Sequence, residues 1–366
     1  MLRRVNIENY RGFQSYRMEG LTTVNLLVGR NNSGKTALLE AVHFLASDGD
    51  PAVLLAAASR REEVASGGRE ERLLPDVSHF FHGHDIAPGS RFTLASDQDV
   101  PPVTVEAVPL GDLDSDAELF EDARAVSSAF ALKIQGGRHG ARAEPAVLLS
   151  EEGALLVDPR RLPWRYPGKE RRNGPPAAFI APDSIGPVSL GTMWNHVLRG
   201  KQEGKVREAM RILEPDLEDI VLQAGEPMYR SYAGGSGVLV SFRGHQRRVP
   251  LGSTGDGMRR LLALSVSLIH ARNGYLMIDE IDTGLHYSIM AKMWELVVRT
   301  ARQSNIQVFA TTHSADCVRG LGVLCKGSPD LREDVSVHKI ERELDSNVRF
   351  SGAEVLDAVE QEIEIR

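Results

Sequence analysis

A lysine and a threonine inside a glycine-rich segment near the start of the sequence are residues that can hold phosphate. Residues 29–36 read GRNNSGKT and match the pattern G-x-x-x-x-G-K-[ST]. Glycines in such a loop let successive backbone N–H groups point into one concavity, where they can bind an anion. Lys35 would reach the β- and γ-phosphates of a nucleotide, and the Thr36 hydroxyl would ligate Mg²⁺. We therefore predict a phosphate-binding loop made of Gly29, Arg30, Asn31, Asn32, Ser33, Gly34, Lys35 and Thr36.

The residues on both sides of this loop have the pattern that a phosphate cradle needs. The segment TVNLLV (23–28) is apolar and rich in strand-forming residues, which predicts a buried strand. The segment KTALLEAVHFLA (35–46) has apolar residues at helical spacing, and a helix would add the partial positive charge of its N-terminus. The alternative is an ordinary Gly-Asn turn before a helix, which the agreement of motif and context argues against.

Two acids and a histidine follow apolar segments in the last third of the sequence. Asp279 and Glu280 come after YLMI, and His313 comes after VFATT. Strand and helix patterns alternate here, which predicts a parallel sheet with ligands at the carboxyl ends of its strands. We expect Asp279 to hold Mg²⁺, Glu280 to orient or deprotonate the attacking water, and His313 to bond the γ-phosphate, because phosphoryl transfer depends mostly on positioning and charge stabilisation. The alternatives are a surface acid pair and a capping histidine.

A second glycine-rich turn, PLGSTGDG (250–257), precedes an apolar segment with helical spacing. Ser253, Gly255 and Gly257 would expose backbone N–H groups at a helix N-terminus, which is a second anion site. One phosphate needs only one cradle, so two cradles suggest that each nucleotide is shared between two copies of the chain. The alternative is a plain helix cap.

Together these residues resemble the ABC-type ATPase class, and within it the SMC, RecF and OLD (overcoming lysogenization defect) ATPases. The opening VNIENYRGFQSYRMEGLTTVNLLVGRNNSGKTALLEAV looks like the start of those ATPase heads. The segment STGDGMRR stands where the class has its signature sequence, with Asp256 at the Gln/Glu position. IDEIDTGLHYS and FATTHSAD are most similar to the OLD-like branch, although Asp282 stands where a glutamate is more usual. The resemblance covers residues 1–46 and 178–316.

The resemblance implies an α/β fold, a P-loop ABC-type ATPase head with a mixed sheet and flanking helices. It also implies binding of ATP with Mg²⁺ and an ATP-dependent homodimer, which could assemble further. Ser253, Gly255 and Asp256 of one subunit would close over ATP held by the loop of the other. Arg11, in NYRGF, matches an arginine that contacts nucleotide in some relatives.

The order of the patterns places the head in two parts of the sequence. We expect residues 1–90 and 178–366 to form the head and residues 91–177 to form an inserted β-rich region with helical pieces. Strand candidates in the insertion are RFTLAS (91–96), PVTVEAVPL (102–110), AFALKIQ (129–135) and AVLLSEEGALLVD (146–158). Residues 189–221 read as helical with a break at Pro215, and residues 237–251 read as a hairpin with its turn at Gly244.

The segment after His313 decides how far the OLD resemblance extends. OLD proteins usually carry a C-terminal Toprim nuclease domain with an Asp-x-Asp, and this segment is short and has none. The chain therefore resembles the ATPase half alone, an architecture often found in bacterial anti-phage systems beside a separate nuclease or Toprim-like effector. We expect the sensor ATPase of such a system, a nucleotide-gated dimer with a separate effector as partner. A RecF-like DNA-repair ATPase and a scaffold with negligible turnover remain open alternatives.

Composition limits the class of protein and its partners. The net charge is −7, which disfavours a surface generally coated by nucleic acid, and there are only two cysteines, Cys317 and Cys325. The cysteine usage fits a reducing cytoplasm, and no apolar run approaches the ~20 residues that span a bilayer, so we expect no membrane contact.

Two further segments carry weaker signals. HFFHGHD (79–85) could supply metal ligands in His79, His82, His84 and Asp85, but a turn or strand end is the favoured interpretation. A basic stretch with interleaved aromatic residues is compatible with a nucleic-acid partner; the alternative is an ordinary solvated loop. It comprises Arg160, Arg161, Trp164, Arg165, Tyr166, Lys169, Arg171 and Arg172.

Overall fold

The computed structural model describes residues 1–67, 72–96, 101–109, 130–137, 147–150, 153–155, 174–183, 187–222 and 237–365. The basic stretch at 160–172 lies outside these residues. Within the described residues, no helix has the length and apolar character needed to cross a membrane.

The N-terminal part of the chain begins an antiparallel sheet. Strands β1 (Arg4–Tyr10) and β2 (Phe13–Glu19) form a hairpin whose turn is at Arg11 and Gly12. The sheet order is β2-β1-β6-β7-β8-β9, with β6 (Arg91–Ser96), β7 (Val103–Pro109), β8 (Phe130–Gln135) and β9 (Val147–Leu149). Strands β6, β7 and β8 match the predicted segments closely, whereas β9 covers only the start of the predicted segment 146–158. Because β6 pairs with β1, the first strand of the predicted 91–177 insertion continues a sheet that the head begins, and the domain division stays a prediction.

The second sheet carries the predicted loop and acids. Its order is β10-β14-β15-β3-β16-β17, with β10 (Ala177–Ile180), β14 (Tyr275–Ile278), β15 (Gln307–Thr311), β3 (Val24–Val28), β16 (Val335–Lys339) and β17 (Val348–Ser351). All neighbours are parallel except β17, which is antiparallel to β16. The sheet is therefore mixed, and the carboxyl ends of β3, β14 and β15 meet at one edge, as predicted.

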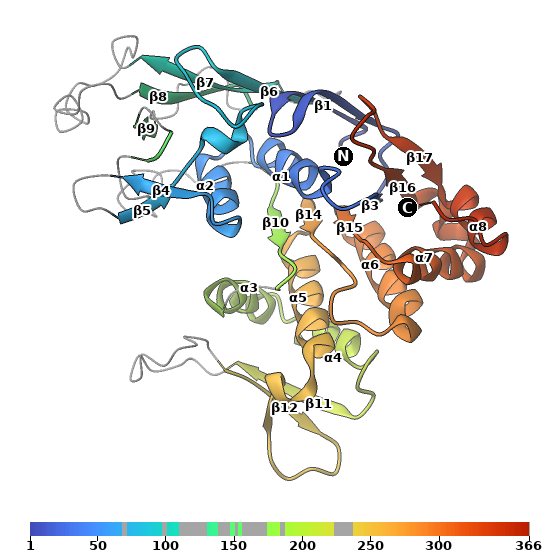
Figure 1. Cartoon of the computed structure of the whole chain (residues 1–366). Coiled ribbons are helices and arrows are strands. Elements are labelled where there is room, and N and C mark those ends of the chain that lie inside the picture. The colour runs from blue at the N-terminus through green and yellow to red at the C-terminus, as the bar shows by residue number, and fades with distance from the viewer. Residues whose placement is uncertain are drawn as a thin grey trace.

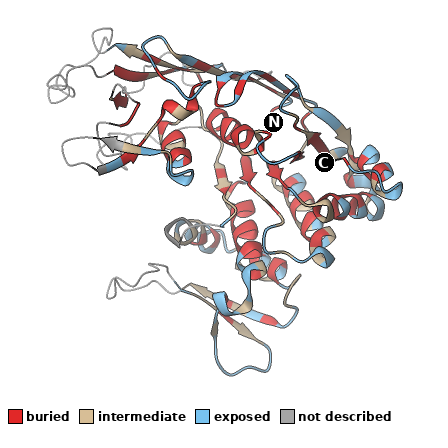
Figure 2. Ribbon diagram, in the orientation of Figure 1, coloured by how far each residue is buried: buried red, intermediate tan, exposed pale blue. Residues whose placement is uncertain are grey.

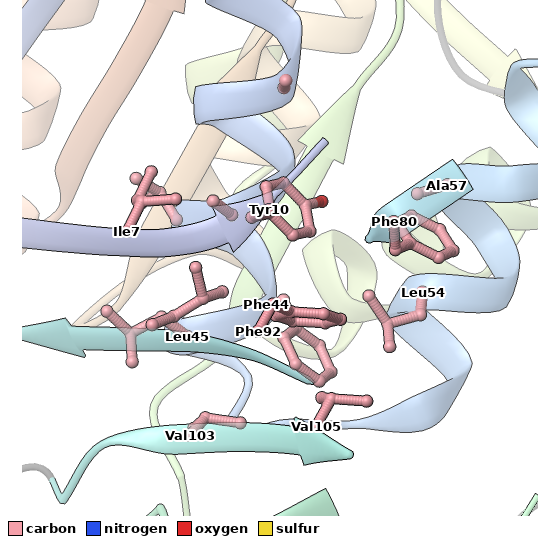
Figure 3. Packing of buried hydrophobic residues seen from close by; sticks show 14 of the residues in the cluster. Ile7, Tyr10, Phe44, Leu45, Leu54, Ala57, Phe80, Phe92, Val103 and Val105 are labelled. Carbon is pink, nitrogen blue, oxygen red and sulfur yellow. The ribbon is translucent and has the colours of Figure 1, made fainter. Parts of the chain in front are cut away.

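Helix α1 (Lys35–Ala46) lies between the two sheets and contacts β6 on one side and β10, β14 and β15 on the other (Figure 1). A helix that is covered on two sides must be apolar nearly all round, and all of its residues except Thr36 are buried (Figure 2). Figure 3 shows Phe44 of α1 packed with Tyr10 of β1 and Phe92 of β6, so this core fixes the helix that follows the loop.

The other face of the parallel sheet is covered by helices α5 (Asp256–His270), α6 (Met290–Ser304), α7 (Ala315–Gly327) and α8 (Gly352–Glu360). Alternate residues of β3 take opposite sides: Val24, Leu26 and Val28 join this core, whereas Leu27 joins the core around α1. Strands buried on both faces read as continuous apolar runs, which is why VNLLV shows no alternation.

A third layer packs on the outer side of α5. Helices α3 (Pro187–Arg199) and α4 (Glu203–Met210) and the sheet β11-β12-β13, made of β11 (Leu217–Leu222), β12 (Val238–Phe242) and β13 (Val249–Pro250), share a core with α5. The hairpin prediction with its turn at Gly244 is confirmed. The helical prediction to residue 221 is wrong at its end, because residues 217–222 form a strand that pairs with β12. Pairing with a strand elsewhere in the fold determines whether such a short segment is helix or strand.

The remaining described elements are short. They are α2 (Pro51–Arg60), the hairpin of β4 (Val64–Gly67) and β5 (Arg72–Pro75), and the 3₁₀ turns η1 (Ser78–Phe80), η6 (Leu251–Thr254), η7 (Tyr287–Ile289) and η8 (Pro329–Asp334).

Candidate active site

The predicted phosphate loop connects β3 to α1, and its glycines are required by its shape. Gly29 has φ of 144° and Gly34 has φ of 97°, which are backbone angles that other residues resist. A Cβ at Gly29 would collide with the Ile340 carbonyl, and a Cβ at Gly34 would collide with the Phe13 ring. The buried Ser33 hydroxyl has no hydrogen-bond partner among the described residues. An unsatisfied buried hydroxyl in this loop fits a ligand that accepts or donates there.

Lys35 is buried, and its ammonium donates to the carbonyls of Gly29 and Arg30, each at 2.8 Å. Burial lowers the pKa of Lys35 to about 8, while the nearby carboxylates of Asp279 and Glu280 act in the opposite direction. The lysine charge therefore lies at the loop and beside the acids that the sequence analysis assigned to the same site.

Thr36 and Asp279 meet at the carboxyl edge of the parallel sheet. The Thr36 hydroxyl lies 3.2 and 3.1 Å from the two Asp279 carboxylate oxygens, and the Thr311 hydroxyl donates to Asp279 Oδ1 at 2.6 Å. A hydroxyl and a carboxylate are the oxygen ligands that Mg²⁺ prefers. This donor set fits the predicted metal.

Glu280 is half-buried, and hydrogen bonds hold both its backbone and its carboxylate. Its N–H donates to Thr311 Oγ1 at 2.8 Å, and Thr283 Oγ1 donates to its carboxylate at 3.1 Å. Its φ is 48°, a left-handed conformation that is uncommon for glutamate and is often found at functional sites. One further acid, Asp282, accepts a hydrogen bond from Thr312 at 2.6 Å, so the strand-end threonines orient two of the three acids that follow β14.

A cleft of about 680 Å³ brings the loop, Glu280 and His313 together. The cleft is also lined by Arg61, His84 and Arg342, to which the sequence analysis gave no nucleotide role. Arg61 and Arg342 lie in no local motif, so no signal in the sequence could have found them, and the histidine-rich segment around His84 indicated metal ligands and not a nucleotide contact. Its complete lining is Arg11, Gly12, Phe13, Asn31, Asn32, Ser33, Gly34, Lys35, Thr36, Ala37, Arg61, Glu63, His84, Glu280, His313 and Arg342.

Arg11 reaches the cleft but is already paired with two carboxylates. Its Nε lies 2.9 Å from Glu40 Oε2, and its Nη1 lies 2.6 Å from Glu63 Oε1. Glu40 also pairs with Arg61 at 2.9 Å, and the Arg11 guanidinium stacks over Phe80 with 4.4 Å between the Cζ atom and the ring centroid. A nucleotide contact by Arg11 stays a prediction, and it would compete with these ion pairs.

The second predicted cradle does not join the cleft within this subunit. Ser253, Gly255 and Asp256 are exposed and are not among the residues that line the cleft. Gly255 has φ of 95°, and α5 begins at the next residue. The Asp256 carboxylate, 83% exposed, lies 3.6 Å from the Arg259 guanidinium. The turn therefore faces solvent, where a second molecule could reach it.

The histidine-rich segment gives no metal cluster in the described part of the chain. His79 lies in η1, and His82 Nδ1 lies 3.0 Å from the Arg11 carbonyl. His84 lines the cleft, and its ring centroid is 5.4 Å from that of His79.

Two family models match the chain in separate segments. Residues 1–95 match "AAA ATPase domain", and residues 197–316 match "AAA domain, putative AbiEii toxin, Type IV TA system". The first segment holds the phosphate loop, and the second holds the acid pair, His313 and the turn at Ser253. The two halves of the site therefore each match an ATPase model.

Curated proteins and solved structures are also similar to this chain. The chain is 21% identical over 337 residues to an "ATP/GTP phosphatase" of Helicobacter pylori, covering 87% of this chain and 86% of that protein. It is 48% identical over 44 residues to the DNA replication and repair protein RecF of Acinetobacter baylyi, which is 12% of each chain. A solved SMC head bound to the C-winged helix domain of ScpA matches with a TM-score of 0.51 at 13% identity, covering 96% of this chain and 97% of that one. The fold is that of an SMC ATPase head, and the similarities support an ATPase of the AAA, SMC and RecF type.

Proposed function

We propose that this chain binds ATP with Mg²⁺ and hydrolyses it as a nucleotide-gated homodimer. The observation that carries this proposal is the contact of Thr36 with Asp279, in a cleft that Lys35, Glu280 and His313 also line or adjoin. Loop, strand-end acid and histidine come from three segments far apart in the sequence. Their convergence is what phosphoryl transfer requires.

Each residue has a distinct task in this proposal. The loop amides and Lys35 hold the triphosphate. Thr36 and Asp279 would hold Mg²⁺, which would supply positive charge against the phosphate oxygens. Glu280 orients the attacking water and accepts its proton, and His313 contacts the γ-phosphate. Ser253, Gly255 and Asp256 of a second copy close over the nucleotide.

We further propose that the biological role is that of a sensor ATPase in a bacterial anti-phage system, acting on a separate nuclease or Toprim-like effector. Support comes from the OLD-like segments IDEIDTGLHYS and FATTHSAD and from a family model whose description names a toxin of a toxin–antitoxin system. The cytoplasm is the proposed compartment, since both cysteines, Cys317 and Cys325, are free and buried.

A second candidate function is a DNA-repair ATPase that clamps DNA itself. The observation in its favour is the 48% identity to RecF, although this similarity covers only 44 residues. Stimulation of hydrolysis by duplex DNA would distinguish this candidate from an ATPase that awaits a protein effector.

The first test is ATP hydrolysis by the wild type and by Glu280→Gln, with and without duplex DNA, with oligomer mass recorded in the same samples. Loss of a general base costs about 100-fold or more, so the variant should turn over at least that much more slowly while still binding ATP. Glu295→Gln, a surface glutamate that pairs with Arg299 on α6, is the matched control and should retain full turnover. Equal rates for wild type and Glu280→Gln would refute the proposal.

A further inference from the structure

Helix α5 carries, one turn beyond its exposed start, an arginine that binds the backbone around the hydrolytic acid. Arg260 is only 1% exposed. Its Nη2 donates to the carbonyls of Asp279 and Glu280 at 2.6 and 2.7 Å, and its Nε is 3.5 Å from the Ile281 carbonyl. Its Nη1 donates to the Ala181 carbonyl at 2.7 Å, just after β10. One side chain therefore holds the backbone of three successive residues.

The conformation of Glu280 explains what this arrangement does. A glutamate at φ of 48° stays there only when its surroundings impose it. The planar guanidinium presents its donors in a fixed fork, so it can hold several carbonyls in one geometry, which a compact ammonium cannot. Without Arg260, the carbonyls of Asp279 and Glu280 would be buried without this donor, and the turn that aims the Glu280 carboxylate would be free to change.

A second contact joins the same two segments. A Cβ at Gly257, in the first turn of α5, would lie 3.0 Å from the Gly284 carbonyl oxygen. A Cβ at Gly284 would likewise lie 3.1 Å from Asp256 Cβ. The start of α5 thus packs directly on the loop that follows Glu280, and Arg260 holds the beginning of that loop from the next turn of the same helix.

We propose that Arg260 is a positioning residue that couples the exposed Ser253–Gly255 turn to Glu280 of the same subunit. The inference rests on the proposed function, since it takes Glu280 as the residue that directs water and the turn as the contact to ATP on a second copy. A helix moves as a unit, so engagement of the turn shifts α5, and Arg260 and the Gly257–Gly284 contact transmit the shift to the backbone of Glu280. Each subunit then becomes competent to hydrolyse its own ATP when its turn has contacted the ATP that the partner subunit holds.

The charge of Arg260 is compatible with this role. Burial lowers its pKa to about 10, and the carboxylates of Asp282, Asp279 and Glu280 oppose that shift. Arg260 is therefore cationic throughout the neutral pH range and keeps all of its donors.

The test compares full-length Arg260→Lys and Arg260→Gln with the wild type. A small misplacement of a catalytic group costs up to about 100-fold in rate. We expect kcat to fall by about 100-fold in Arg260→Gln and about 10-fold in Arg260→Lys, while KM and the affinity for a fluorescent ATP analogue change by less than about 3-fold. Arg332→Lys is the control, because Arg332 also donates to a backbone carbonyl, that of Cys325 at 2.7 Å, outside the cleft. It should keep the wild-type kcat.

Unchanged kcat in both Arg260 variants would overturn the proposal, and so would a parallel loss of affinity and kcat. Hydrogen exchange of the amides at 279–283 separates this result from failure of the proposed function. If the wild type binds ATP without hydrolysing it, the proposed hydrolytic function is rejected. Hydrogen exchange alone then tests whether the turn is coupled to Glu280. Slowing of exchange by ATP in the wild type but not in Arg260→Lys would support the coupling, whereas equal slowing in both would refute it.

Discussion

At the scale of single residues, Lys35 makes nucleotide binding depend on pH. Burial lowers its pKa to about 8, so the lysine loses its proton above that pH in the free protein. Bound phosphate favours the ammonium and raises the pKa, so binding above pH 8 must take up a proton. ATP affinity should be flat below pH 8 and fall by up to about 10-fold per pH unit above it.

The measurement is titration of a fluorescent ATP analogue between pH 7 and pH 9.5. Lys35→Met is the control, because it should bind weakly at every pH without the change near pH 8. A wild-type affinity that stays constant across this range would contradict the assigned role of the lysine.

The same scale shows what the sequence could and could not predict about the site. The loop, Asp279 and Glu280 were found because each lies in a local pattern at a strand end, and the structure brings Thr36 and Asp279 together. Thr311 and Arg260 were given no role, although both bind the segment that holds the acids. Their partners are 19 or more positions away, and a pairing between distant residues leaves no mark in local spacing.

At the scale of elements, a buried polar network joins β3 to β16 below the loop. Asn347 Nδ2 lies 2.7 Å from His338 Nδ1, and His338 Nε2 lies 2.8 Å from Ser336 Oγ and 3.3 Å from Asn25 Oδ1. The amide of Glu19 donates to Asn347 Oδ1, which fixes the amide group so that its nitrogen faces the ring. His338 Nδ1 is then an acceptor, and the ring is neutral.

This network predicts loss of stability in acid. Burial, with a smaller effect of Arg349, lowers the pKa of His338 to about 3, and burial also lowers that of His43 to about 3. The unfolded chain takes up protons near pH 6.5, whereas the folded chain does not, so stability is full above pH 6.5 and falls toward pH 3. Each histidine contributes about 1.4 kcal/mol per pH unit within that window.

Urea unfolding at pH 7.5, 6 and 5 measures this slope. His338→Gln should be less stable at pH 7.5, and its stability should depend on pH less steeply by about one proton, with His43 still contributing to the slope. An unaltered slope in the variant would show that His338 is not a source of the acid sensitivity.

Helices and strands were predicted correctly where the local sequence pattern was clear. The prediction was wrong where pairing with a distant strand determined whether a segment is helix or strand. The strand at 91–96 was placed correctly from its composition and alternation, and α1 was placed by its helical spacing. Residues 217–221 were assigned to a helix, but they pair with β12 across a segment outside the described residues. A short apolar segment such as LEDIVL is compatible with either state, so its partner in the fold decides.

At the scale of the whole molecule, the proposed ATP site needs two copies of the chain, because the exposed Ser253–Gly255 turn does not line the cleft of its own subunit. In the proposed two-fold dimer, the turn of each copy would lie over the loop of the other, which gives two equivalent sites. In Glu280→Gln, which should bind ATP without hydrolysing it, the oligomer mass should double with ATP. Ser253→Arg should prevent this doubling.

Mixing two inactive variants tests the geometry of that dimer. In a mixed dimer of Lys35→Met and Ser253→Arg, one site contains both lesions, and the other combines an intact loop with an intact turn. That intact site can hold ATP between the two subunits, so the mixture should form a dimer of doubled mass with ATP, whereas neither variant should do so alone. If the turn served the loop of its own chain, each subunit would carry one lesion in its own site, and mixing would restore nothing.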